Sequence, residues 1–109
     1  MTRLCLPLLS TLLFLSACAK PETTTQPVAP MSQGQQIFLS QCVSCHQGAG
    51  DPPGPNVVVL NSPTLKQEET FRALLRQPTS SMMRKFSAQE LPDAEVHALY
   101  EYLSSLQGQ

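Results

Sequence analysis

The sequence predicts an all-α domain in which three main helices are joined by long loops. Three stretches carry apolar side chains at helical spacing, and residues that commonly bound helices flank each of them. No segment has the alternation and tight turn that indicate a β-hairpin. Ten prolines and five glycines among 109 residues predict many turns between the helices.

The first helix is expected over residues 33–41, after Ser32, whose hydroxyl can cap the free backbone N–H groups. Ile37 and Phe38 give this helix an apolar face. Gly34 costs a helix about 1 kcal/mol relative to alanine, which suggests that another backbone crosses close to it.

The segment after residue 46 is expected to be loop as far as residue 56, because it is rich in glycine and proline. Residues 57–60 form a β-branched run that we interpret as a buried loop edge rather than a strand. A second helix is expected over about residues 66–76. Two glutamates in its first turn and Arg76 in its last turn suit the helix dipole.

A further loop is expected over residues 79–86, followed by the final helix. Asp93 is expected to cap that helix, which then ends near Leu106. Its buried stripe is predicted to consist of Val96, Leu99, Tyr100, Leu103 and Leu106.

The N-terminal part of the chain predicts export and a flexible tether. Residues 1–17 have a basic start and an apolar stretch, which is typical of a secretory signal. Leu15-Ser16-Ala17-Cys18 resembles the bacterial lipoprotein signal, which implies that Cys18 becomes the acylated mature N-terminus. An ordinary signal peptide, with Cys18 there by chance, is the alternative. Residues 18–32 are then a lipidated, proline-rich tether, and residues 33–109 the folded domain.

The pentapeptide Cys42-Val43-Ser44-Cys45-His46 has the C-x-x-C-H pattern of covalent c-type haem attachment. Two thiols on one turn can reach the two vinyl groups of one porphyrin, and His46 can then ligate the iron. A zinc site would need further ligands, of which the processed chain offers only His97. A thioredoxin-like site would need a βαβ pattern that is missing.

The overall composition excludes some classes of function. A net charge of −1 and a pI near 6.0 give no basic field, so no nucleic-acid partner is expected. The chain has no tryptophan and six Phe or Tyr residues, which predicts a thin aromatic core. A covalently bound haem would supply the missing apolar core group.

Residues 33–106 resemble the class I monohaem cytochromes c. The stretch from Gly34 to His46 resembles their first helix and haem site, and Leu99 and Tyr102 match the residues that cross that helix. Pro55 resembles the loop proline whose carbonyl accepts the proximal imidazole N–H. The resemblance implies the small cytochrome c fold, one haem c, thioether bonds to both cysteines, and this supporting role for Pro55 toward His46.

The resemblance also implies a distal methionine ligand before the last helix. The family often has a Met-x-x-Phe loop there, and Met83-Arg84-Lys85-Phe86 fits its spacing. Met83 is therefore the predicted second iron ligand and Met82 the alternative. A proline commonly follows the ligand methionine in the family, whereas Arg84 follows Met83 in this chain.

The resemblance implies a one-electron carrier and not an enzyme. The carrier would be anchored to a membrane, on its periplasmic or lumenal face. Redox protein partners would dock transiently on a monomer, at the exposed haem edge. Arg84 and Lys85 either attract an acidic partner or simply form a solvated loop. The alternatives are a haem subunit of a larger oxidase or dehydrogenase complex, and a haem-based gas sensor if the methionine ligand is absent. His97 is expected to face solvent on the last helix.

Overall fold

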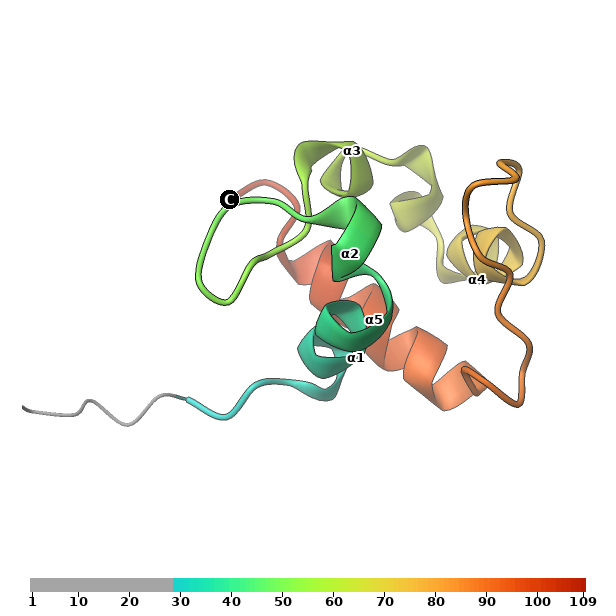
Figure 1. The fold of residues 1–109 in the computed structure, drawn as a ribbon, viewed down its shortest axis with the longest axis horizontal. Coiled ribbons are helices and arrows are strands. Elements are labelled where there is room, and N and C mark those ends of the chain that lie inside the picture. The colour runs from blue at the N-terminus through green and yellow to red at the C-terminus, as the bar shows by residue number, and fades with distance from the viewer. Residues whose placement is uncertain (1–28) are drawn as a thin grey trace, which may run out of the picture.

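A computed structural model describes residues 29–109, and the part it describes is helical, as predicted (Figure 1). Between residues 29 and 109 there is no strand, and the only β-type pairing is an isolated bridge between Gln47 and Pro55. In chain order, the elements are α1 (Gln33–Gln41), α2 (Val43–His46), α3 (Val57–Leu60), the 3-10 helix η1 (Pro63–Lys66), α4 (Glu68–Arg76) and α5 (Asp93–Ser105).

The predicted signal segment (1–17), Cys18 and the predicted tether as far as residue 28 lie outside the described residues. Within residues 29–109, no helix has the length and apolarity needed to cross a membrane.

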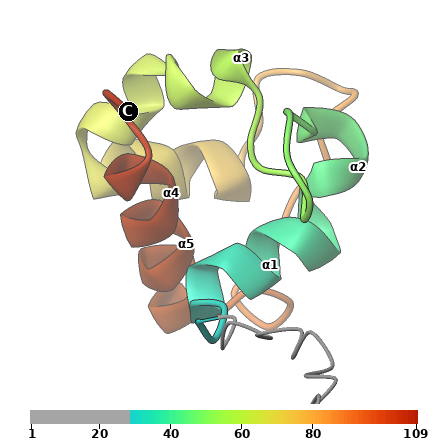
Figure 2. The same ribbon diagram turned by 90° about the vertical axis from the view of Figure 1, so that its left-hand side faces the viewer.

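The helix α1 lies across α5, and these two helices are in close contact where they cross (Figure 2). The Ser32 hydroxyl caps α1 by accepting the Gln35 backbone N–H at 3.2 Å, as predicted. A Cβ on Gly34 would lie 2.6 Å from Tyr102 Cβ and closer still to the Ala98 carbonyl oxygen. Gly34 therefore permits the close backbone crossing that its presence in a helix suggested.

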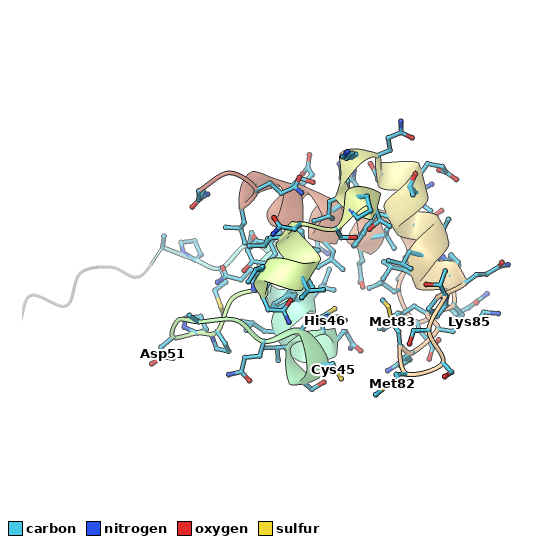
Figure 3. The ribbon with its side chains drawn as sticks, turned by 90° about the horizontal axis from the view of Figure 1, so that it is seen from above. Cys45, His46, Asp51, Met82, Met83 and Lys85 are labelled. Atoms are coloured by element: carbon cyan, nitrogen blue, oxygen red, sulfur yellow. The ribbon has the colours of Figure 1, made fainter. Side chains whose placement is uncertain are left out.

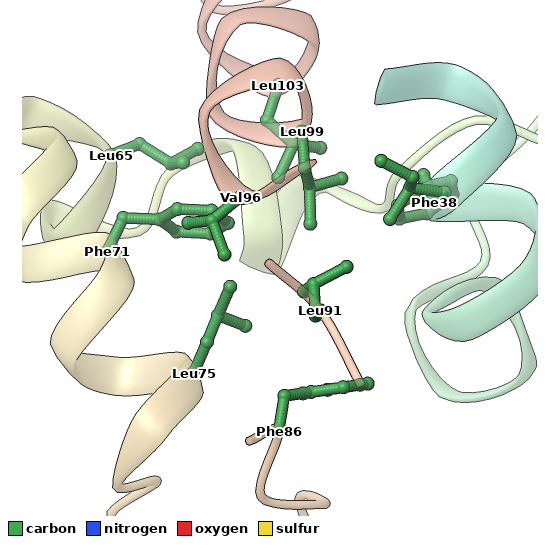
Figure 4. Packing of buried hydrophobic residues seen from close by; sticks show 10 residues of the cluster. Phe38, Leu65, Phe71, Leu75, Phe86, Leu91, Val96, Leu99 and Leu103 are labelled. Carbon is green, nitrogen blue, oxygen red and sulfur yellow. The ribbon is translucent and has the colours of Figure 1, made fainter. Parts of the chain in front are cut away.

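Ten buried apolar side chains form one core between α1, α4, η1 and α5 (Figure 4). They are Ile37, Phe38, Leu65, Phe71, Leu75, Phe86, Leu91, Val96, Leu99 and Leu103. Phe86 and Leu91 come from residues 77–92, the segment between α4 and α5, so this irregular stretch is anchored in the core.

The predictions for residues 57–60 and for the cap of the last helix are wrong. Residues 57–60 are a short helix instead of a buried edge, because the Asn56 side chain caps it by accepting the Val59 N–H at 3.1 Å. Val57 and Val58 are 67% and 75% exposed. Asp93 is not the cap of α5: Pro92 holds that position, and Asp93 is the first helical residue.

The second helix starts at Glu68, two residues later than expected, because a separate 3-10 helix precedes it. The 3-10 helix η1 begins after Ser62, whose hydroxyl accepts the Thr64 N–H, and α4 starts only after the extended residue Gln67. The last helical residue of α4 is Arg76, as expected. Within the predicted stripe of α5, Tyr100 and Leu106 are half-buried rather than buried.

Candidate haem site

The C-x-x-C-H pentapeptide forms a tight turn that continues directly from α1. The Cys42 N–H donates to the Phe38 carbonyl at 2.9 Å, and the His46 N–H donates to the Cys42 carbonyl at 3.0 Å. Because Phe38 is buried in the core, this bond fixes the start of the turn to the α1–α5 crossing. The turn then carries Cys42, Cys45 and His46 within four residues of each other.

The two thiols of the turn have different surroundings. Cys42 is half-buried, and burial raises the pKa of its thiol to about 11 because the thiolate would lose solvation. Cys45 is exposed. Both are free cysteines, so the chain leaves both sulfur atoms available for thioether bonds.

The loop after the turn closes back on it through backbone bonds. The Gly48 N–H donates to the Gly54 carbonyl at 2.7 Å, and the Asn56 N–H donates to the His46 carbonyl at 2.9 Å. A Cβ on Gly48 would lie 2.6 Å from the oxygen of the buried Pro55, so only glycine allows this closure. The loop therefore fixes the backbone of His46, while a bond from Pro55 to the imidazole remains a prediction.

An inner cavity of about 150 Å³ lies between this turn and the core. His46 and Cys42 form part of its wall, and Met83 another part. The remaining wall is mostly apolar and comes from α1, α3, η1, α4 and α5. It consists of Phe38, Val58, Val59, Ser62, Thr64, Leu65, Phe71, Leu74, Leu75, Leu99 and Leu103.

An outer cavity of about 530 Å³ adjoins the inner one and has a more polar wall. Its wall includes Cys45 and Met82. Three residues line both cavities: Cys42, His46 and Met83. In Figure 3, His46 and Met83 come from opposite sides of this region, from the α2 turn and from residues 77–92.

The residues around the two cavities fit a haem c group. The inner cavity offers an apolar surface for a flat hydrophobic ring, and the exposed Cys45 lies on the outer side, where one ring edge would meet solvent. An imidazole and a thioether are among the side chains that bind haem iron in cytochromes c. The donor set and its apolar surroundings therefore agree with the group that the motif predicts.

The two candidate methionines differ in position. Met82 is 92% exposed and lines only the outer cavity. Met83 is half-buried, packs against the core and lines both cavities. Both methionines belong to one turn that starts at Ser80. The Met83 N–H donates to the Ser80 carbonyl, and the Met82 N–H donates to the Ser80 hydroxyl.

Arg84 and Lys85 differ as well. The Arg84 guanidinium donates to Glu90 at 2.9 Å and lies 4.7 Å from the centre of the Phe86 ring. Bonds from Ser87, followed by the Arg84 contact, lower the pKa of the Glu90 carboxyl. Lys85 is exposed and has no ion pair with any residue from 29 to 109. Arg84 thus has a structural role in its loop that the sequence did not reveal.

His97 lies on α5 away from both cavities and is exposed, as predicted. Its Nδ1 lies 2.9 Å from Glu68 of α4, and its Nε2 lies 3.4 Å from Glu101. The Glu68 contact, followed by Glu101, raises the pKa of His97. No group of three or more His, Cys, Asp or Glu side chains suited to a metal occurs within residues 29–109.

Comparison with known proteins gives one family. The family model described as "Cytochrome C oxidase, cbb3-type, subunit III" matches residues 29–103, which is more than half of the chain. The matched span includes every residue of the inner cavity wall. No curated protein and no solved structure matches the chain.

Proposed function

The chain belongs to the family described as cytochrome C oxidase, cbb3-type, subunit III, and from this membership we propose that it is a monohaem one-electron carrier. A cytochrome c domain binds haem c covalently and uses its iron for electron transfer. The observation that carries the proposal is that Cys42, His46 and Met83 line both cavities.

Cys42 and Cys45 hold the haem in this proposal, each through a thioether bond. Cys42 anchors the buried side, because it packs against the core, and Cys45 anchors the side next to solvent. The turn that carries them is fixed to α1 by the bond from Cys42 to Phe38. Attachment at two points of one rigid turn keeps the group in a single orientation.

His46 and Met83 would be the two side chains that hold the haem iron. The loop that ends at Asn56 restrains the His46 backbone, and a carbonyl bond from Pro55 would orient the imidazole and strengthen it as a ligand. Met83 approaches from residues 77–92, on the other side of the region that both cavities occupy. With both side chains bound to the iron, no position would be left for a substrate, which is why we propose a carrier and not an enzyme.

The apolar wall sets the conditions for electron transfer. When bound, haem c supplies the one-electron couple of its iron. A thioether ligand and burial of the haem raise the reduction potential above that of a haem held by two imidazoles. Phe71, Leu75 and Leu99 are buried side chains that give the inner cavity an apolar wall. A wall of close-packed side chains changes little between the two charge states, which keeps the reorganisation small.

Partners would dock where the site meets solvent. Met82 and Cys45 are exposed in the wall of the outer cavity, and the exposed Lys85 lies between two residues of that wall, Arg84 and Phe86. A small interface there suits a short-lived complex of a monomeric carrier with a redox protein. Lys85 favours an acidic partner, because it has no ion pair within the described part of the chain.

Membrane attachment is the further part of the proposal. Residues 1–17 are removed, Cys18 is acylated, and residues 18–32 tether the domain 33–109 to the periplasmic or lumenal face of a membrane. The support is the sequence Leu15-Ser16-Ala17-Cys18 and the export that haem c attachment requires. Mass spectrometry of the mature N-terminus tests this: a diacylglyceryl-modified Cys18 is expected, and an unmodified N-terminus contradicts it.

A second candidate function is that of a haem subunit in a larger oxidase. The specific observation that favours it is the description of the matching family, which names a subunit of a cytochrome c oxidase. A carrier should separate from other proteins when membranes are dissolved in mild detergent. A subunit should co-purify with the larger complex in fixed stoichiometry.

The carrier proposal is tested by exposing the ferrous holoprotein to carbon monoxide. If His46 and Met83 hold both axial positions, the ferrous spectrum should remain unchanged on a timescale of minutes, and a physiological oxidant should still reoxidise the protein. Rapid and stoichiometric carbon monoxide binding would support a gas sensor with an open position and would overturn the carrier proposal.

A further inference from the structure

One arginine connects the end of α4 to the irregular segment that carries Met83. The Nη1 of Arg76 donates to the carbonyls of Phe86 and Ser87 at 3.2 and 3.1 Å. Its Nη2 donates to the Leu91 carbonyl at 2.8 Å and to Asp93 Oδ1 at 2.7 Å. The side chain is only 22% exposed, so these four acceptors surround most of the guanidinium.

These bonds matter because residues 77–92 have no helix of their own to hold their shape. The Gln77 N–H donates to the Ala73 carbonyl, and the Phe86 N–H donates to the Leu75 carbonyl at 2.9 Å. The last turn of α4 therefore fixes both ends of the loop from residue 77 to residue 86, and Met83 lies inside it. Arg76 fixes the second end at two successive carbonyls.

The path of this loop decides where the Met83 sulfur lies. Met83 is only three residues before Phe86, whose ring is buried and whose carbonyl Arg76 binds. If the loop moved away from α4 by a few ångströms, Met83 would leave the wall of the inner cavity. Bonds from a charged, partly buried donor to carbonyls are stronger than neutral ones, so Arg76 opposes this movement.

We propose that Arg76 is a positioning residue for the axial Met83: by holding the second end of the Met83 loop, it keeps the thioether sulfur over the site. This inference rests on the proposed ligation by Met83. Arg76 itself touches neither cavity, so it acts only through the loop.

The neighbouring Arg72 provides a matched control. It lies one turn earlier on α4 and pairs with Glu68 at 2.9 Å and with Asp93 at 3.7 Å. Arg72 thus carries the same charge as Arg76, lies on the same helix and contacts the same carboxylate, that of Asp93. Unlike Arg76, it donates no hydrogen bond to a carbonyl of residues 77–92.

The test is the binding of free imidazole to the ferric holoprotein, because imidazole must displace Met83 to reach the iron. A looser loop raises the fraction of molecules in which Met83 is detached from the iron. The apparent Kd for imidazole falls in proportion to that fraction. For Arg76→Gln we expect a Kd about 10- to 100-fold lower, with Arg76→Lys intermediate because a single ammonium can satisfy only some of the acceptors. Arg72→Gln should stay within about 2-fold.

A double substitution separates positioning from a general loss of stability. In a Met83→Ala background no thioether competes with imidazole, so adding Arg76→Gln should leave the Kd unchanged. An equal effect of Arg76→Gln with and without Met83 would overturn the inference, as would equal effects of Arg76→Gln and Arg72→Gln. If Arg76→Gln does not fold, Arg76→Lys decides by the same comparison.

The spectrum of the unsubstituted protein separates failure of this inference from failure of the proposed function. A ferric protein without the weak far-red band of iron–thioether bonding overturns Met83 ligation, and the role of Arg76 with it. A protein with that band, in which the Arg76 variants bind imidazole like the Arg72 variant, overturns the role of Arg76 alone.

Discussion

Replacing Gly34 by alanine should destabilise the domain, although the same change stabilises most helices. A new Cβ would lie 2.6 Å from Tyr102 Cβ and 2.8 Å from the Ala98 carbonyl carbon, well inside the usual carbon–carbon contact distance of about 3.5–4.0 Å. The contacted atoms belong to the backbone of α5 or lie next to it. They cannot rotate away, so α1 and α5 must separate.

The size of the effect follows from two opposing terms. Alanine favours a helix over glycine by about 1 kcal/mol. Overpacking a tight contact typically costs about 1–3 kcal/mol, and this contact lies at the upper end because backbone atoms are involved. We therefore expect a net loss of about 2 kcal/mol in the free energy of unfolding. The shift of α1 also displaces Phe38, to which the Cys42 turn is bonded.

Urea unfolding of the holoprotein, followed by far-ultraviolet circular dichroism, measures this loss. The midpoint should fall by about 1 M, given a typical slope of about 1–3 kcal/mol per M. Gly54→Ala is the control, because its Cβ would lie 3.7 Å from the nearest atom, and it should change the stability by less than about 0.5 kcal/mol. A Gly34→Ala protein as stable as the unsubstituted one would refute the close crossing.

Two further predictions concern charged groups. Because the folded-state pKa of His97 is raised and that of Glu68 is lowered, their contact should stabilise the fold fully between the ordinary values of 4.5 and 6.5. This contribution should disappear as the pH rises through the folded-state pKa of His97. The urea midpoints of the unsubstituted protein and of His97→Gln should therefore converge at alkaline pH. A difference between the two midpoints that does not change with pH contradicts this. Replacing Lys85 by glutamine should slow association with an acidic redox partner by about 2- to 5-fold at low ionic strength. Stopped-flow mixing measures that rate, and an effect that persists undiminished at high salt would argue against charge steering.

The local features of the fold could be predicted from the sequence because short-range chemistry determines them. Ser32 caps α1 through a bond to a residue three positions away, and the C-x-x-C-H turn lies within five residues. Gly34 and Phe38 predicted the helix crossing because a glycine inside a helix is costly unless a close contact requires it. These signals need no knowledge of distant parts of the chain.

Some of the features that the sequence did not reveal are local, and others depend on contacts between distant residues. The propensity of Val57 and Val58 favoured an extended and buried segment, but the Asn56 side chain caps a helix there and leaves both valines exposed. Asp93 looked like a helix cap, whereas its carboxylate pairs with Arg76, seventeen residues earlier. A side chain that binds carbonyls across a loop leaves no periodic pattern in the sequence.

For the site, spacing to Phe86 favoured Met83, and the three-dimensional path of residues 77–92 gives the physical basis for this preference. Phe86 is buried in the core, so the chain three residues before it must pass along the inner cavity, while Met82 extends into solvent. The sequence could not establish this path, because it depends on how the loop is fixed to α4.

The central claim is that Met83 completes the iron coordination opposite His46. It is tested most directly by the far-red absorption band of iron–thioether bonding in the ferric holoprotein, measured for the unsubstituted protein, Met83→Ala and Met82→Ala. The band is expected to be present in the unsubstituted protein, to persist in Met82→Ala and to be lost in Met83→Ala. A band that survives in Met83→Ala, or that is absent from the unsubstituted protein, would contradict it.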